Sequence, residues 1–448
     1  MAPPNSNMTS DPNELVTKKS LAIALSAPRA PPSGSTHRAA MLGREVTENP
    51  YHKSLTDTTS PRLQQRLFRQ LRNAYRTAAS HAPHPHLPSA LDTGDVVTRA
   101  LGAWLSVASQ NRFRDSGGFR RLVDFLVVLS APAIPLSAPS AGWNFLMLTK
   151  QVKKLRYGLN SLQYIDFFLP YDPAETFTNT RSARRLIFFV HGGAWGSGEP
   201  WMYRLVAGAF LELGYAVAIV GYRTYPDGTV VDQVADLRDA AAFLAQTHPA
   251  WCERQVTVMG HSSGAHIALL FLVDRFITST KLSVTANGSG DFRIDSFVGL
   301  SGPYDISHHF DYEANRGVEE MSPLKPANGY TRQSFRTHSP ALRLLDSLAC
   351  QVESNRVIDK LFPLLVLIHG IEDDTVPFTA TAEAGRILRS CGALCQEIYI
   401  TETRHQDMVM QIMLGGKTLD AVIDWIQLLH HESPAPTPIY KVHAKSKL

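Results

Sequence analysis

From about residue 156 onward, short apolar runs alternate with segments whose apolar residues recur every three or four positions. The runs have the length of strands and the periodic segments have the length of helices. The predicted strands are 162–170, 184–190, 215–222, 254–260, 295–301, 362–370 and 395–401, and the predicted helices are 203–214, 230–246, 265–276, 381–392 and 419–431. Short apolar strands that alternate with helices predict a mostly parallel central sheet flanked by helices on both faces.

The pattern also divides the chain. Residues 1–60 are rich in Pro, Ser, Thr and Ala and have no sustained period, so we expect them to be disordered. The pattern predicts a helical extension over residues 61–155 and the α/β domain over residues 156–432. The alternation fails over about 302–345, which indicates a small inserted cap. The segment 433–448 reads as a flexible tail.

Two stretches of the helical extension raise the question of a membrane. Leucines and arginines at helical spacing after Pro61 predict a basic amphipathic helix, which would lie on an anionic membrane or dock on the α/β domain. The run 125–148 has 24 uncharged residues, which is long enough to cross a bilayer, but three prolines interrupt it. A re-entrant or monotopic membrane segment and a buried connector both fit better than a single span.

Charge and cysteine usage narrow the class of protein. The net charge is +4, yet the first 121 residues hold 16 Lys and Arg against 8 Asp and Glu. This asymmetry favours an anionic partner for the N-terminal part, such as a membrane surface, and no nucleic-acid-binding signature accompanies it. Four cysteines do not make a disulfide framework, and neither metal-ligand spacing, a phosphate loop nor a cleavable signal is present. We therefore expect no cofactor and no metal.

The segment "GHSSGAH", 260–266, lies between a predicted strand and a predicted helix and fits G-x-S-x-G. In that context the serine is held above the sheet on a sharp turn, where the N-terminus of the helix favours a developing negative charge. Only Ser262 has a glycine two residues away on each side. We therefore predict Ser262 as a nucleophile and Ser263 as a backbone N–H donor to an oxyanion.

The segment "FFVHGGAWGSG" follows a predicted central strand and supplies further candidate oxyanion donors, Gly192, Gly193 and Ala194. Small residues there allow backbone N–H groups to point at a substrate carbonyl oxygen, and one such donor contributes roughly 10²–10³ to a rate. His191 reads as a structural residue of this loop.

A serine nucleophile needs a base, and a histidine base needs an acid to orient it. His405 follows the predicted strand 395–401 and is the strongest base candidate, ahead of His369 and His266. The loop after 362–370 offers the acids Glu372, Asp373 and Asp374. Both loops follow the carboxyl ends of strands, where open α/β sheets place their ligand sites.

These segments resemble the α/β-hydrolase superfamily, and within it the isoprenylcysteine methylesterase group. The resemblance extends from about Tyr157 to His430 and includes "HGGAWGSG", "YRTYPDG", "GHSSGAHIA", "SGPYDI" and "HSPAL". The group's pattern H-G-x-x-D-x-x-x-P falls on His369, Gly370, Asp373 and Pro377, which favours Asp373 over Asp374. The resemblance implies the α/β-hydrolase fold and a serine carboxylic ester hydrolase that acts on a small lipophilic ester, such as a prenylcysteine methyl ester.

Two alternatives for the function and one possible localisation signal remain open. The sequence also resembles kynurenine formamidase-like enzymes, which implies an arylformamide as the other substrate, and a catalytically silent α/β-hydrolase used as a binding module is the non-enzyme alternative. The chain ends in Ser446, Lys447 and Leu448, which matches a peroxisomal import signal read by a receptor. We expect a peroxisome or a related organelle, with attachment to ER or Golgi membranes as the second choice.

Overall fold

The computed structural model describes residues 107–130, 139–170, 185–253, 255–282, 292–349 and 362–429. The predictions made for residues 1–106, including the basic amphipathic helix, lie outside these residues. The same holds for the tail 433–448 with its Ser446, Lys447 and Leu448. All of them stay predictions.

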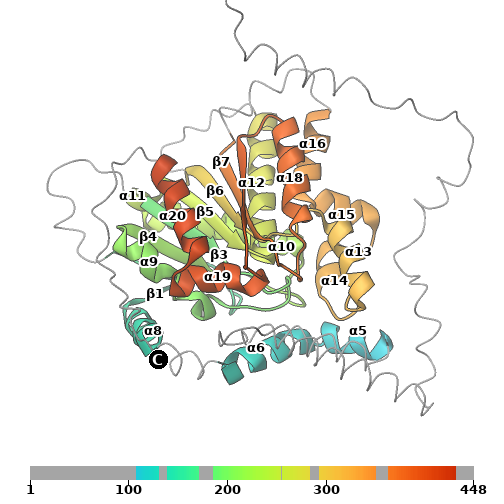
Figure 1. Ribbon diagram of the computed structural model, residues 1–448, viewed down its shortest axis with the longest axis horizontal. Coiled ribbons are helices and arrows are strands. Elements are labelled where there is room, and N and C mark those ends of the chain that lie inside the picture. The colour runs from blue at the N-terminus through green and yellow to red at the C-terminus, as the bar shows by residue number, and fades with distance from the viewer. Residues whose placement is uncertain are drawn as a thin grey trace, which may run out of the picture. The chain divides into compact units, whose positions relative to one another are not determined.

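An eight-stranded sheet forms the centre of the fold, in the order β1-β2-β4-β3-β5-β6-β7-β8 (Figure 1). The strands are β1 (Lys153–Arg156), β2 (Tyr164–Phe168), β3 (Arg185–Val190), β4 (Tyr215–Val220), β5 (Val256–His261), β6 (Ile294–Leu300), β7 (Leu364–Gly370) and β8 (Cys395–Ile400). β2 pairs antiparallel with both β1 and β4, and the pairs from β4 through β3 to β8 are parallel. The carboxyl ends of β3, β5, β7 and β8 therefore meet at one edge.

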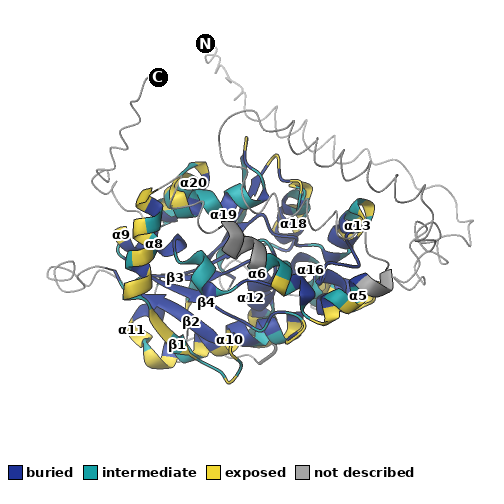
Figure 2. Cartoon of the chain, turned by 90° about the horizontal axis from the view of Figure 1, so that it is seen from below, coloured by how far each residue is buried: buried dark blue, intermediate teal, exposed yellow. Residues whose placement is uncertain are grey.

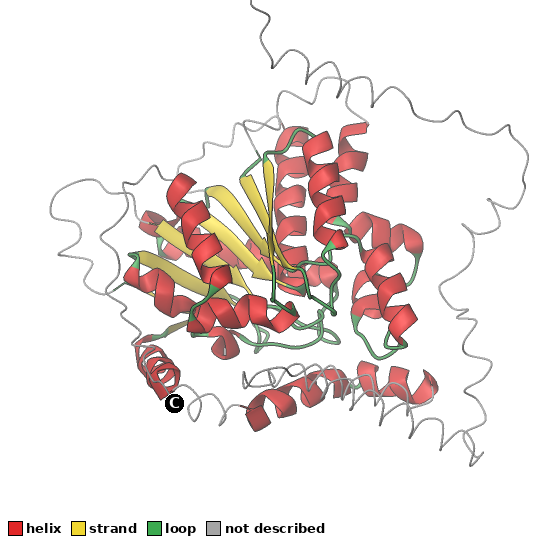
Figure 3. Ribbon diagram, viewed as in Figure 1, coloured by secondary structure: helices red, strands yellow, loops and turns green. Residues whose placement is uncertain are grey.

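The central strands are apolar on both faces because helices cover both (Figure 3). On one face, Ile187 and Phe189 of β3 pack with the helices α9 (Val206–Glu212), α19 (His405–Leu414) and α20 (Lys417–Leu429). On the other face, α12 (Ser263–Leu282) packs on β5 and β6, and α10 (Val230–Thr247) packs beside α12. The strands β2, β3 and β4 are accordingly drawn in the colour of buried residues in Figure 2. The fold class predicted from the apolar pattern is confirmed.

Most helices that flank the sheet overlap the predicted segments, whereas the helices at 249–252 and 405–414 were not predicted. The first face carries η2 (Pro200–Tyr203), α9 (Val206–Glu212), α19 (His405–Leu414) and α20 (Lys417–Leu429). The second face carries α10 (Val230–Thr247), α12 (Ser263–Leu282) and α18 (Thr379–Ser390), and the short helix α11 (Pro249–Cys252) follows α10. Helix α19 is a difference from the sequence interpretation, which placed His405 in a loop: His405 is the first residue of α19.

The stretch predicted as a cap, 302–345, contains no strand in the structure. It consists of four helices, namely α13 (Ile306–Arg316), α14 (Leu324–Asn328), α15 (Arg332–His338) and α16 (Pro340–Ala349). Asp305 caps α13 by accepting from the backbone N–H of His308, and Gly317 ends it with a φ of 70°. Helix α16 continues four residues beyond the predicted end of the cap and packs on α12.

Three helices precede the sheet: α5 (Val107–Asp115), α6 (Gly118–Ser130) and α8 (Pro139–Gln151). The uncharged run 125–148 is divided between α6 and α8, and residues 131–138 between them are outside the described part. In the described ranges, we find no helix whose length and apolarity would let it cross a bilayer.

The first strand begins earlier than the sequence interpretation placed the α/β domain. β1 starts at Lys153, and Leu148 of α8 already packs in the core cluster, whereas the boundary was expected between 155 and 156. The sequence "KKLR" carries no apolar alternation because β1 is an edge strand whose lysines are exposed. Lysines on an edge strand hinder pairing with another chain.

Candidate active site

Ser262 lies on the turn between β5 and α12, with a φ of 56°. A non-glycine residue is uncommon in this left-handed region, so the surrounding structure must hold it there. The backbone N–H of Ser262 donates to the carbonyl of Leu300 at 2.8 Å, and its own carbonyl accepts from Ala265 and His266 of α12. The serine side chain is thereby held above the carboxyl edge of the sheet.

The two glycines of G-x-S-x-G are required by close backbone contacts. A Cβ at Gly260 would lie 2.6 Å from the carbonyl oxygen of Gly264 and 2.7 Å from the N atom of Ala265. A Cβ at Gly264 would lie 2.3 Å from the carbonyl oxygens of both Val190 and His191. These contacts bring the start of α12 against the end of β3, next to the loop 191–198.

The structure brings Ser262, His405 and Asp373 together from three parts of the chain. His405 Nε2 is 2.8 Å from Ser262 Oγ, and His405 Nδ1 is 2.8 Å from Asp373 Oδ2. The Asp373 side chain is fully buried and that of His405 nearly so. In this arrangement the histidine can take the serine proton while the carboxylate orients the ring and stabilises its charged form.

Asp373 is well suited to remain ionised. Burial alone would raise the pKa of its carboxyl, but the neighbouring His405 and the hydrogen bonds from His369 and His405 lower that pKa well below its usual range. Oδ1 also accepts from the backbone N–H groups of Thr375 and Val376 at 3.0 and 2.8 Å. The neighbouring Asp374 instead offers its backbone carbonyl to the Tyr312 hydroxyl.

The loop 191–198 places the candidate oxyanion donors beside Ser262. A Cβ at Gly192 would lie 3.0 Å from Cβ of Ser262, so the loop passes directly over the serine. Gly193 and Ala194 have φ values of 137° and 49°. Within the described ranges, the backbone N–H groups of Gly193, Ala194 and Ser263 donate no hydrogen bond. Because these N–H groups have no protein acceptor, they can donate hydrogen bonds to an oxyanion that develops at this point.

The strand order, the serine turn after β5, the acid loop after β7 and the histidine after β8 together decide the fold family. The chain has the α/β-hydrolase fold. The BD-FAE family model matches residues 173–386.

The chain is also similar in sequence to two curated plant proteins. The chain is 28% identical over 296 residues to a probable isoprenylcysteine alpha-carbonyl methylesterase of Oryza sativa subsp. japonica, covering 64% of this chain and 66% of that protein. It is 28% identical over 290 residues to the isoprenylcysteine alpha-carbonyl methylesterase of Arabidopsis thaliana, covering 63% of each. The matches thus span just under two thirds of these relatives. The resemblance to this group that the motifs indicated is confirmed.

A further relative and one solved structure complete the comparison. A kynurenine formamidase of Drosophila melanogaster is 25% identical over 184 residues, covering 39% of this chain and 56% of that protein. Esterase B from Lactobacillus rhamnosis aligns with a TM-score of 0.46 at 15% identity, covering 68% of this chain and 95% of that structure.

The loop 191–198 is fixed by contacts that no sequence motif indicates. Trp195 is fully buried, and its indole N–H donates to His266 Nδ1 at 3.1 Å. His266 Nε2 donates in turn to the carbonyl of His338 at 2.7 Å. This chain of hydrogen bonds links the loop to the first turn of α12 and to the cap. The only sequence signal was the helical position of His266 just after the serine turn.

Two further histidines support the loop and the base. His191 stacks between Tyr203 and Tyr222, with ring centroids at 5.5 and 4.4 Å, and burial lowers its pKa to about 4. Burial likewise lowers the pKa of His261 to about 3. The Nε2 of His261 donates to the backbone carbonyl of His405 at 3.0 Å. Both rings are therefore neutral at pH 7 and hold backbone in place.

Asp407 lies in the first turn of α19, the helix that begins with His405. Its carboxylate accepts from the backbone N–H of Arg404 at 2.9 Å, at the start of α19. Because a carboxylate in the first turn satisfies a free N–H and favours the helix dipole, Asp407 stabilises the helix that begins with His405.

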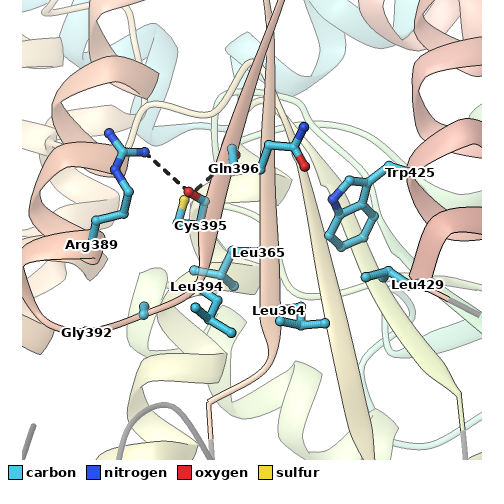
Figure 4. A pocket seen from close by; sticks show the side chains of 10 residues that line it. Leu364, Leu365, Arg389, Gly392, Leu394, Cys395, Gln396, Trp425 and Leu429 are labelled. Atoms are coloured by element: carbon cyan, nitrogen blue, oxygen red, sulfur yellow. Dashed lines mark hydrogen bonds between the residues drawn. The ribbon is translucent and has the colours of Figure 1, made fainter. Parts of the chain in front are cut away.

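A pocket of about 500 Å³ lies at the opposite edge of the sheet (Figure 4). Its walls come from the first residues of β7 and β8 and from α20, with Leu364, Leu394 and Trp425 among them. Since Ser262, Asp373 and His405 follow the carboxyl ends of their strands, this pocket is separate from the candidate site. In the described part of the chain, no cluster of three His, Cys, Asp or Glu side chains could hold a metal ion.

Proposed function

We propose that this α/β-hydrolase is a serine carboxylic ester hydrolase that works through an acyl-enzyme. The observation that carries the proposal is the pair of 2.8 Å hydrogen bonds that join Ser262, His405 and Asp373 at the carboxyl edge of the sheet. The alternative of a catalytically silent binding module predicts that at least one of these contacts is broken, and none is.

The geometry suggests the order of proton transfers. His405 Nε2 takes the proton of Ser262 Oγ as this oxygen attacks the ester carbonyl, and the oxyanion that forms is bound by the free backbone N–H groups of the loop 191–198 and of Ser263. The C–O bond then breaks and the alcohol leaves with the proton from His405. Water, deprotonated by the same histidine, attacks the acyl-enzyme and releases the acid and Ser262.

For the substrate, we propose a small lipophilic methyl ester of the prenylcysteine type. The support comes from the two plant relatives, which are named isoprenylcysteine methylesterases. An arylformamide such as N-formylkynurenine is the second candidate because of the relative named kynurenine formamidase. The same nucleophile and oxyanion donors would serve a formamide carbonyl, with an amine as the leaving group.

The test compares the hydrolysis of farnesylcysteine methyl ester and N-formylkynurenine by the full chain. We expect a higher kcat/KM for the methyl ester, and a loss of about 10⁴-fold or more in kcat on Ser262→Ala. A fluorophosphonate probe should label the native chain but not Ser262→Ala. Hydrolysis that persists in a folded Ser262→Ala variant would refute the serine mechanism, and absence of labelling of the native chain would favour a binding module.

A further inference from the structure

The Asp373 carboxylate is shared between two histidines. Its Oδ2 lies 2.8 Å from Nδ1 of His405 and 3.2 Å from Nε2 of His369. The His369 and Asp373 side chains are both fully buried. His405 belongs to the triad, whereas the mechanism proposed above gives His369 no part.

The hydrogen bonds of His369 determine which of its ring atoms faces the carboxylate with a proton. Nε2 lies 2.8 Å from the carbonyl oxygen of Val376, and a carbonyl oxygen can only accept, so Nε2 carries a hydrogen. Nδ1 lies 2.7 Å from the hydroxyl of Thr381 on α18. The Nε2–H is therefore directed at Val376 O, while Asp373 Oδ2 lies 3.2 Å from the same nitrogen, and Thr381 contacts the ring through Nδ1 and holds it in that orientation.

We propose that His369 is a positioning residue of the triad, which holds the Asp373 carboxylate in the plane that His405 requires. The proposal rests on the proposed function, because it names a second support for the same acid. Without His369, Oδ2 would keep the N–H of His405 but lose the second N–H group that lies beside it, and Oδ1 would keep the backbone N–H groups of Thr375 and Val376.

The groups around this carboxylate determine the direction of the effect on pH dependence. Among the described residues, the titratable groups that interact with Asp373 include His405 on α19, His369 on β7, His261 at the end of β5 and His309 on α13. His405 donates to the carboxylate, and the N–H of His369 Nε2 lies close to it, at an N···O distance of 3.2 Å. Removing the His369 donor leaves more negative charge on Oδ2 facing His405, which favours the charged imidazole.

His369→Phe removes the donor and keeps a flat ring, whereas His369→Gln keeps an amide N–H that can donate to Oδ2. We expect His369→Phe to lower kcat by roughly 10- to 100-fold at nearly unchanged KM, because a displaced triad costs chemistry rather than substrate contacts. The acid limb of its kcat/KM profile should move to higher pH. His369→Gln should restore most of kcat and the native profile.

Thr381 gives a second, milder test of the same orientation. Thr381→Val removes the hydroxyl that contacts His369 Nδ1, and Thr381→Ser keeps it. We expect the Val variant to lose severalfold in kcat, in the same direction as His369→Phe, and the Ser variant to match the native chain. Thermal unfolding of each variant shows whether the fold is intact.

A measurement that does not need turnover separates this proposal from the proposed function. The proton between His405 Nδ1 and Asp373 gives a low-field ¹H NMR resonance, which should shift or broaden in His369→Phe and remain in His369→Gln. If the native chain hydrolyses no ester or formamide but the resonance responds in this way, the proposed function fails and the positioning role stands. If the native chain is active and folded His369→Phe keeps its kcat, pH profile and resonance, the positioning role is refuted.

Discussion

At the scale of single residues, the site depends on the unusual backbone conformation of Ser262 and on two glycines beside it that leave no room for a Cβ atom. Ser262 adopts a φ of 56°, which costs of order 1–3 kcal/mol, and the structure must compensate for it nearby. Gly260 and Gly264 permit the close contacts between the end of β3 and the start of α12. Gly260 and Gly264 therefore hold the strained turn at Ser262 in place, although neither has a reactive side chain.

Gly264→Ala should therefore damage both stability and activity. The added Cβ would lie 2.3 Å from the carbonyl oxygens of Val190 and His191, so β3 and α12 must separate. We expect a loss of at least about 2 kcal/mol in the free energy of unfolding, and a larger relative loss of kcat because the loop 191–198 follows β3 directly. Chemical unfolding and ester hydrolysis measure the two effects.

The matched control is Gly208→Ala in α9, where a Cβ would have no neighbour within 4 Å. Alanine favours a helix over glycine by about 1 kcal/mol, so this variant should be as stable as the native chain or more so, with unchanged kcat. Equal behaviour of the two alanine variants would contradict the account of the serine turn.

At the scale of elements, the apolar pattern predicted the central strands because they are buried on both faces, which leaves a continuous apolar signal in β3 and β4. The exposed edge strand β1, with the sequence KKLR, leaves no such signal. The motifs indicated residues at strand ends, and Ser262, Asp373 and His405 do converge there; their catalytic roles stay predictions.

The supporting contacts of the site could not be predicted in this way. The hydrogen bond from Trp195 to His266 and the close contact of His369 with Asp373 depend on ring orientation and on the packing of separate elements. Neither leaves a period or a spacing in the sequence. A motif marks which residues meet at the sheet edge, whereas tertiary packing decides what holds them there.

Helix α5 is attached to the cap by a buried cation. Arg114 is 3% exposed, and its guanidinium donates to the backbone carbonyl of Glu320 at 3.0 Å. The Glu320 carboxylate lies 3.7 Å from the same guanidinium and also accepts from Lys325. Since these groups are buried, removing the arginine leaves the Glu320 carbonyl without its side-chain donor and the Glu320 carboxylate without a nearby positive charge.

Arg114→Ala should loosen α5 from the cap at a cost of roughly 3 kcal/mol. Native-state hydrogen exchange of the α5 amides should accelerate, while the exchange of the β5 and β7 amides changes little. The matched control is Arg121→Ala on α6, because Arg121 is exposed and its guanidinium donates to Ser116 within the same helical pair. Acceleration of equal size in both variants would contradict the role of Arg114.

At the scale of the whole molecule, the fold buries several histidines in the neutral form. Burial lowers the pKa of His191 to about 4 and that of His261, His266 and His309 to about 3, against an ordinary value of 6.5. Each ring is neutral in the folded chain at a pH where it would be protonated in the unfolded chain. Folding therefore excludes protons over a wide range of acid pH.

The sign of the resulting pH dependence follows from linkage. Below pH 6.5 the unfolded state binds more protons than the folded state, so stability falls as the pH is lowered toward about 4 for His191 and about 3 for the others. Each histidine contributes a slope of about 1.4 kcal/mol per pH unit inside its window. Asp373 acts in the same direction at lower pH, since its lowered pKa gives stability that is lost on protonation.

We therefore expect the free energy of unfolding to decrease steeply between pH 6.5 and 4, measured by denaturant titration at a series of pH values. His266→Gln should reduce the slope by about one proton, because an amide can accept from Trp195 and donate to the His338 carbonyl without titrating. A flat profile in this range for the native chain would show that the buried rings are protonated in the folded state.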